Sequence, residues 1–179
     1  MNASLVLGAA VAALLPAFAA PASPAMAGSP TYREAADVRL PPIASAGQLV
    51  LYGHVSSLTR RAGRFELRFD PAWWLTGVAA ERAAADDGAI RPGEPVPNDY
   101  YVVDEGHRLL AFVVSAGARV TVLTSSAVGT RITVSELAQL VAGRNPRHRR
   151  LLEPKAGYWI RVGGRYPNPV VSLDQQYQP

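Results

Sequence analysis

The densest charge in the chain lies in the stretch RNPRHRR, residues 144–150. Its ionisable side chains are Arg144, Arg147, His148, Arg149 and Arg150. A cluster of positive charge of this density can attract anionic partners. The stretch predicts either a loop that binds an anionic cell-wall polymer, lipid headgroups or nucleic acid, or a solvated loop without a partner. Because no regularly interleaved aromatic residues offer a base-stacking surface, the pattern argues against nucleic acid.

Aromatic residues form a second candidate binding group. The stretch DPAWWLTG, residues 70–77, holds two adjacent tryptophans. An aspartate followed by proline is typical of a helix start, so we expect a helical turn here, with Thr76 capping a further helix. Neighbouring helical residues point about 100° apart, so the two rings cannot share a face. We expect Trp74 to be buried and Trp73 to be exposed, where it joins Tyr100 and Tyr101 as a candidate contact for a partner.

The residues that most often carry catalysis give no recognisable constellation. The chain has three histidines, His54, His107 and His148, and none has a metal-binding partner two to four residues further on. Cysteine is absent and no G-x-S-x-G elbow occurs, so we predict no catalytic residue, no metal and no cofactor. One alternative is a secreted hydrolase built on paired carboxylates with help from a histidine. Another is a cation bound at Asp86 and Asp87.

The N-terminal sequence indicates export. Residues 3–20 form an apolar segment, interrupted by proline, that precedes the first charged side chain. Two small-x-small sites follow, ending at Ala19 and Ala27, and we prefer cleavage after Ala27. The segment 1–27 is therefore predicted to be a signal peptide, and the mature chain to have no transmembrane span and to be secreted or associated with the cell envelope. An uncleaved anchor is the alternative.

The mature chain is predicted to hold one domain. Residues 28–47 are rich in proline and alanine and are expected to form a flexible tether, followed by a single globular, β-rich domain over residues 48–179. The whole chain carries 18 basic and 14 acidic residues, a formal net charge of +4. This excess is too small to indicate nucleic acid by itself.

Alternating apolar residues predict about seven strands. We expect them in the stretches LVLYGHVSSL, RFELRFD, DYYVVDE, HRLLAFVV, ARVTVLT, GYWIRV and PVVSLDQQY. Residues 104–107 are expected to be a hairpin turn, as is GGRYPN. An alanine-rich helix over 77–87 should end at Gly88, and a capping box at Thr133 should open a helix to about Ala142. The class is therefore α+β, mainly antiparallel, a small β-barrel-like sheet with two main helices.

The order of these motifs resembles a group of small exported proteins and lipoproteins of Gram-positive bacteria. They share a D-P-x-x-W-L-T-G pattern leading an alanine-rich helix, an N-D-Y-Y pattern opening a strand, and a terminal hairpin. The likeness covers most of residues 67–179, with matches at 70–71, 74–77 and 98–101. The chain departs from the group in lacking a lipobox cysteine and in having Asp104 in place of asparagine. The resemblance implies export and a shared fold, and no activity.

These observations favour a non-enzymatic exported domain that binds a cell-envelope or extracellular partner. The expected partner is an anionic envelope polymer or an extracellular protein. The contact surface is expected at the 144–150 loop or at an aromatic patch.

Overall fold

The computed structural model describes residues 44–104, 106, 108–163 and 169–178. The predicted signal segment 1–27 and most of the predicted tether lie outside these residues, as do His107 and most of the turn expected at GGRYPN. Most of the predicted domain over residues 48–179 lies within them.

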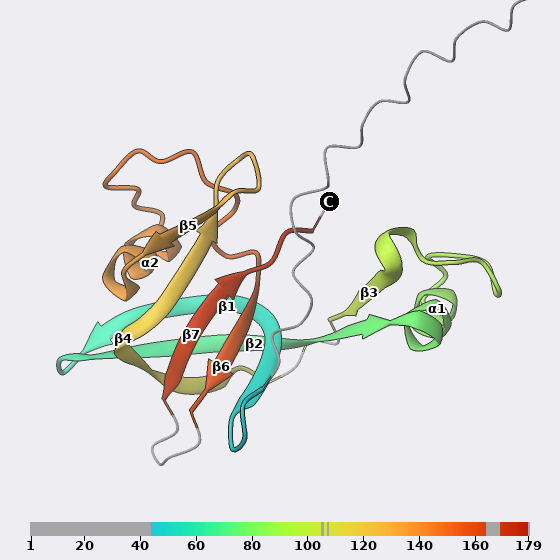
Figure 1. Ribbon diagram of the computed structural model, residues 1–179, viewed down its shortest axis with the longest axis horizontal. Coiled ribbons are helices and arrows are strands. Elements are labelled where there is room, and N and C mark those ends of the chain that lie inside the picture. The colour runs from blue at the N-terminus through green and yellow to red at the C-terminus, as the bar shows by residue number, and fades with distance from the viewer. Residues whose placement is uncertain (1–43, 105, 107, 164–168, 179) are drawn as a thin grey trace, which may run out of the picture. The chain divides into compact units, whose positions relative to one another are not determined.

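The fold consists of a mainly antiparallel sheet and two helices (Figure 1). The strands are β1 (Leu49–Arg61), β2 (Arg64–Thr76), β3 (Tyr100–Val103), β4 (Leu110–Leu123), β5 (Gly129–Ile132), β6 (Gly157–Val162) and β7 (Val170–Gln175). The helices are α1 (Gly77–Asp86) and α2 (Val134–Val141), with a short 3-10 turn at Pro97–Asp99. The predicted α+β class and the number of strands are confirmed.

Five of the strands close into a barrel. Strand β1 pairs with β2 and with β6, β2 pairs with β4, and β7 lies between β4 and β6. The β4–β7 pair is parallel and the other pairs are antiparallel. A helix, α2, lies in the chain between the third and fourth barrel strands. This order, with one parallel closing pair, is the arrangement of an OB-fold barrel.

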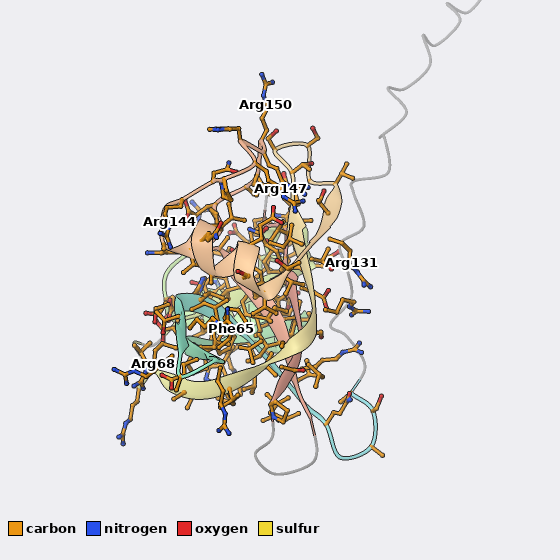
Figure 2. The ribbon with its side chains drawn as sticks, turned by 90° about the vertical axis from the view of Figure 1, so that its left-hand side faces the viewer. Phe65, Arg68, Arg131, Arg144, Arg147 and Arg150 are labelled. Carbon is orange, nitrogen blue, oxygen red and sulfur yellow. The ribbon has the colours of Figure 1, made fainter. Side chains whose placement is uncertain are left out.

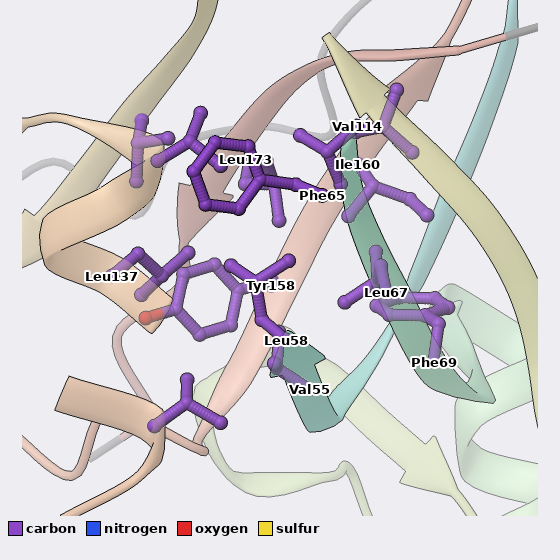
Figure 3. Packing of buried hydrophobic residues seen from close by; sticks show 14 of the residues in the cluster. Val55, Leu58, Phe65, Leu67, Phe69, Val114, Leu137, Tyr158, Ile160 and Leu173 are labelled. Atoms are coloured by element: carbon purple, nitrogen blue, oxygen red, sulfur yellow. The ribbon is translucent and has the colours of Figure 1, made fainter. Parts of the chain in front are cut away.

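The barrel interior is filled by apolar side chains, and α2 closes one end. Inward-facing residues of every barrel strand form one buried cluster, and Val134, Leu137, Leu140 and Val141 of α2 belong to it. Figure 3 shows Leu137 beside the rings of Phe65 and Tyr158. Tyr158 and Leu137 are fully buried. The apolar face of α2 therefore fixes the helix to the barrel. The loop that follows α2 starts from this fixed helix.

The helical turn predicted at residues 70–76 is wrong, because this segment continues β2. Its first part pairs with β1, and Trp73 to Thr76 pair with β3. Side chains of a strand alternate between faces, so the two tryptophans are separated by the sheet itself. Trp73 is 60% exposed, and Trp74 is half-buried. The expected order of exposure is therefore confirmed, although its assumed helical cause is not.

Two further predictions about the middle of the chain are corrected. The strands expected at HRLLAFVV and ARVTVLT are one long strand, β4, and the seventh strand is instead β5. The link at residues 104–107 does not join a hairpin, because β3 and β4 both pair with β2 and not with each other. Together they line one edge of β2, β4 along residues 65–69 and β3 along 73–76.

Both helices begin and end close to where the sequence predicts. The side chain of Thr133 accepts a hydrogen bond from the amide of Glu136 at 3.1 Å and so caps α2. Thr76 occupies the N-cap position of α1 but makes no side-chain cap bond, and Gly88 follows α1 with a φ of 73°. Within the described residues, no helix has the length and apolar content needed to cross a membrane.

A candidate anion-binding end of the barrel

Four arginines surround the hairpin that joins β1 to β2, and we call them the hairpin arginines: Arg60, Arg61, Arg64 and Arg68. Because Phe65, Leu67 and Phe69 point into the barrel, the alternate residues of β2 point outward. Arg61 and Arg64 lie opposite each other across the two strands. The guanidinium carbon of Arg60 lies 5.7 Å from the centre of the Phe65 ring, a cation–π contact that holds this side chain at the barrel end.

The loop after α2 carries the arginines that the sequence singled out, and Glu136 organises two of them. Its buried carboxylate lies 3.1 Å from Nε of Arg149 and 3.6 Å from Nε of Arg147. The Nε–H of Arg149 is not aligned as a hydrogen bond, so the attraction acts mainly between charges. Arg144 and Arg150 are exposed, and they make no ion pair within the described residues. We call Arg144, Arg147, Arg149 and Arg150 the loop arginines.

Asn145 fixes the backbone of this loop. Its side-chain amide donates to the carbonyl oxygen of Arg149 at 2.7 Å, and its side-chain oxygen accepts from the amide of Arg149 at 3.1 Å. The amide of His148 donates to the carbonyl of Asn145, and His148 is exposed with a φ of 49°. Figure 2 shows Arg144, Arg147 and Arg150 around the loop and Arg68 projecting from β2. The predicted surface loop is therefore present, and it has a defined conformation.

Charge is strongly divided along the chain. Residues 77–107, the insertion that holds α1 and β3, carry seven acidic and two basic side chains. Residues 48–76 and 108–179 carry five acidic and fourteen basic side chains. Strand β2 spans thirteen residues from the hairpin arginines to α1, which separates its ends by roughly 40 Å. The overall charge of +4 is therefore the sum of a basic barrel and an acidic insertion.

An open hollow lies between the C-terminal end of α2 and residues 151–155. Its volume is ≈ 650 Å³. Cationic side chains on its walls are Arg144, Arg149 and Lys155, and Glu153 is the one carboxylate in its lining. Apolar walls come from residues such as Leu140 and Leu151. This volume is within the range of roughly 300–1,000 Å³ typical of small-molecule sites.

The aromatic candidates do not gather into one patch with the arginines. Tyr100 stacks on Trp74, with ring centres 4.0 Å apart and planes 14° from parallel. Tyr101 faces the other side of β3, where its hydroxyl donates to Asp87 at 3.0 Å. This bond raises the pKa of Tyr101. Trp73 lies opposite Val103 in the register. All these residues lie at the end of β2 far from its hairpin.

A second aromatic cluster is packed rather than open. Tyr52 lies against Trp74 and Trp159, with ring centres 4.9 Å apart in both pairs. The indole N–H of Trp159 donates to the side chain of Gln176 at 3.1 Å. Burial raises the pKa of the Tyr52 hydroxyl, which has no hydrogen-bond partner among the described residues. The rings fill the space between them, so this cluster anchors β3 and the C-terminal segment to the barrel.

The carboxylates and histidines considered for hydrolysis are not brought into a shared pocket within the described residues. Nε2 of His54 lies 3.9 Å from Oδ2 of Asp104, beyond hydrogen-bond distance. Asp174 is held by Arg119 at 2.9 Å and by the hydroxyl of Thr121 at 2.8 Å. Among the described residues, no three histidine, aspartate or glutamate side chains are placed to hold a metal ion together. His107 lies outside these residues.

Sequence reasoning found the loop arginines but missed the hairpin arginines. The signal is present in the sequence as the closely spaced arginines of RRAGR, residues 60–64. The role of Glu136 was also missed, since its spacing from Thr133 was explained by the capping box alone. The hollow between α2 and residues 151–155 does not follow from local pattern either.

Compared with known proteins, the chain matches no family model, no curated protein and no solved structure.

Proposed function

We propose that this protein is an exported binding domain that recognises an anionic polymer of the cell envelope through the basic surface of the barrel, which carries the hairpin arginines and the loop arginines. The observation that carries this proposal is the division of charge, with fourteen basic side chains in the barrel segments and seven acidic ones in the insertion. Such a field attracts a polyanion to one end of the molecule.

The choice of basic residue supports the same proposal. All basic residues of the chain except Lys155 are arginines. Arginine presents a planar fork of donors that matches phosphate and carboxylate groups, whereas lysine acts as a point charge. The barrel interior is filled with side chains, so a ligand is expected on the outer surface. By analogy with OB-fold barrels, whose ligands lie on the second and third strands and the adjoining loops, we expect the outward face of β2 to be part of that surface.

Binding to isolated bacterial cell walls tests the proposal. The protein is mixed with insoluble wall material before and after its anionic polymers are removed by acid, and the pelleted fraction is measured across a salt series. We expect retention that depends on the polymers and falls with salt. A hairpin variant, R61Q/R64Q/R68Q, should weaken retention and flatten the salt dependence.

The control neutralises the two arginines of the insertion, with the variant R82Q/R91Q. Both side chains are on the acidic part of the chain, so we expect retention to stay unchanged. Arg147 and Arg149 are left intact in these variants, because each of them pairs with buried Glu136. Loss of either arginine would disturb the fold. Equal retention of the wild type and the hairpin variant would contradict the proposal.

Export is a separate part of the proposal and rests on the sequence of residues 1–27. The mass of the protein recovered from the culture medium of its native cells tests it. We expect a chain that begins at Gly28, or at Ala20 if the earlier site is used. Recovery of the full-length chain from the cytoplasm alone would contradict export.

A further inference from the structure

We propose that the open hollow beside the C-terminal end of α2 is a subsite for one phosphate ester of a polyol or sugar. This inference rests on the proposed function in one respect: it identifies the chemical unit that the anionic polymer presents. As a small-molecule site, however, the hollow can be tested without any polymer.

The positive side of the hollow suits a phosphate group. Arg144 and Lys155 both line it, and neither makes an ion pair within the described residues. Arg149 contributes a third cation that is already partly neutralised by Glu136. A phosphate ester presents several acceptor oxygens and up to two negative charges, so it can engage donors from more than one direction. A carboxylate has fewer oxygens to share among them.

The other side of the hollow suits hydroxyl groups. The lining includes Val141 and Ala142, at the end of the helix where the last carbonyls have no amide partner within the helix. The amides of Gly143 and Arg144 cap the carbonyls of Leu140 and Gln139, and among the described residues no backbone amide outside the helix donates to those of Val141 and Ala142. Carbonyl oxygens accept from hydroxyls, and the Glu153 carboxylate offers a further acceptor. Apolar Leu140 and Leu151 can contact the carbon skeleton of the same unit.

The walls are held in place before any ligand arrives. Asn145 clamps the backbone of Arg149 by two hydrogen bonds. On the opposite wall, buried Gln175 donates to the carbonyl of Glu153 at 2.7 Å, and the hydroxyl of Tyr158 donates to the carbonyl of Pro154 at 3.0 Å. Both donors belong to barrel strands. A site whose walls are fixed by the core loses little entropy on binding, which favours recognition of a small unit.

Nuclear magnetic resonance titration of the full chain with glycerol 1-phosphate tests the subsite. We expect amide shifts confined to residues 140–145 and 151–155, with a dissociation constant in the micromolar to millimolar range. The variants R144Q and K155M should each weaken binding roughly tenfold, as loss of one charge-assisted hydrogen bond does. The control R91Q, whose side chain lies on the insertion, should bind as the wild type does.

Two comparison ligands test the two halves of the subsite. Inorganic phosphate should bind more weakly than glycerol 1-phosphate, and glycerol alone should cause no shift. Equal affinity for inorganic phosphate would overturn the polyol part, and absence of shifts at residues 140–145 and 151–155 would overturn the subsite altogether. Glucuronate, a carboxylate on a sugar, should bind more weakly than the phosphate ester, and equal affinity would overturn the assignment to phosphate.

The outcomes separate this inference from the proposed function. If the wild type is retained on cell walls and the hairpin variant is not, but the hollow gives no shifts with glycerol 1-phosphate, the subsite is wrong and the polymer surface stands. If glycerol 1-phosphate binds in the hollow but wall retention is absent, the polymer surface is wrong and the hollow stands as a small-molecule site.

Discussion

Glu136 should stabilise the fold while it weakens attraction of polyanions, and the variant E136Q tests both effects. The side chain is 7% exposed and faces two guanidinium groups. Glutamine keeps its shape and most of its packing, but it removes the negative charge that Arg147 and Arg149 share. The amide of residue 136 still donates to Thr133, so the helix cap is kept.

The magnitude follows from the exposure of each partner. Removing one partner of a fully buried ion pair costs about 3–5 kcal/mol. The side chain of Arg149 is 27% exposed and that of Arg147 is 62% exposed, so solvent screens much of each interaction. The burial cost of the carboxylate itself also disappears. We therefore expect the free energy of unfolding to fall by about 1–2 kcal/mol, which lowers Tm by about 3–8 °C.

Binding to anionic polymer should change in the opposite direction. The substitution raises the net charge at the barrel end by one and releases two guanidinium groups. We expect retention on cell walls at low salt to become roughly twofold to fivefold tighter. The control E81Q removes one negative charge from α1 in the acidic insertion, so it should leave both stability and retention nearly unchanged.

Urea unfolding followed by circular dichroism gives the stability, and cosedimentation with wall material gives the affinity. Unchanged stability of E136Q would show that the charge pairs contribute nothing to the fold. Weaker retention by a folded E136Q would refute the argument from charge, because it would mean that the loop arginines must be held in place by Glu136 to bind.

Two further predictions concern the aromatic cluster on the barrel. The variant G157A should destabilise the fold by about 3 kcal/mol, because a Cβ there would overlap the hydroxyl oxygen of Tyr52 and lie 2.6 Å from its ring carbon Cζ. In the control G117A the added Cβ meets nothing within 4 Å. This control should unfold at the same urea concentration as the wild type. The variant Y52F removes a buried hydroxyl without a hydrogen-bond partner among the described residues, so it should be as stable as the wild type at pH 7 or up to about 1 kcal/mol more stable. Because burial raises the pKa of Tyr52 above its ordinary value of 10.0, the native state keeps a proton that the unfolded chain loses, and stability should fall as pH rises above about 10. Between pH 9 and 12, the urea midpoint of Y52F should fall less steeply with pH than that of the wild type. Identical slopes would contradict the assignment of this pH dependence to Tyr52.

The class and most strands of this fold could be predicted because they depend on local alternation. Phe65, Leu67 and Phe69 alternate with polar residues, and they do point into the barrel. The error at residues 70–76 arose where two local signals conflict. Asp70 and Pro71 are typical of a helix start, whereas the tryptophans, leucine and threonine after them favour a strand. Pairing with β1 on one side and β3 on the other decides the conflict, and these partners lie sixteen to thirty residues away along the chain.

The candidate site was predictable only where its residues are consecutive. The loop arginines lie within seven residues, so their density is visible in the sequence. The hairpin arginines lie some eighty residues earlier in the chain, so the density of charge at residues 144–150 gives no indication of them. Glu136 lies three residues after Thr133, so the sequence explains it as part of a helix cap. Its ion pairs with Arg147 and Arg149, eleven and thirteen positions later, cannot be recognised from that spacing.

The placement of opposite charges at the two ends of β2 has a physical consequence for recognition. In the field of a polyanion, the acidic insertion is repelled while the hairpin arginines are attracted, so the molecule approaches with its barrel end first. Attraction acts when the barrel end comes near the polyanion and repulsion acts when the insertion does, so approach in the reversed orientation is disfavoured without any added contact. The field of such a charge distribution extends about a Debye length, some 8–10 Å at physiological salt. Since β2 separates its ends by several times this distance, each end responds to its own surroundings, and a net charge of +4 understates how strongly the barrel end attracts anions.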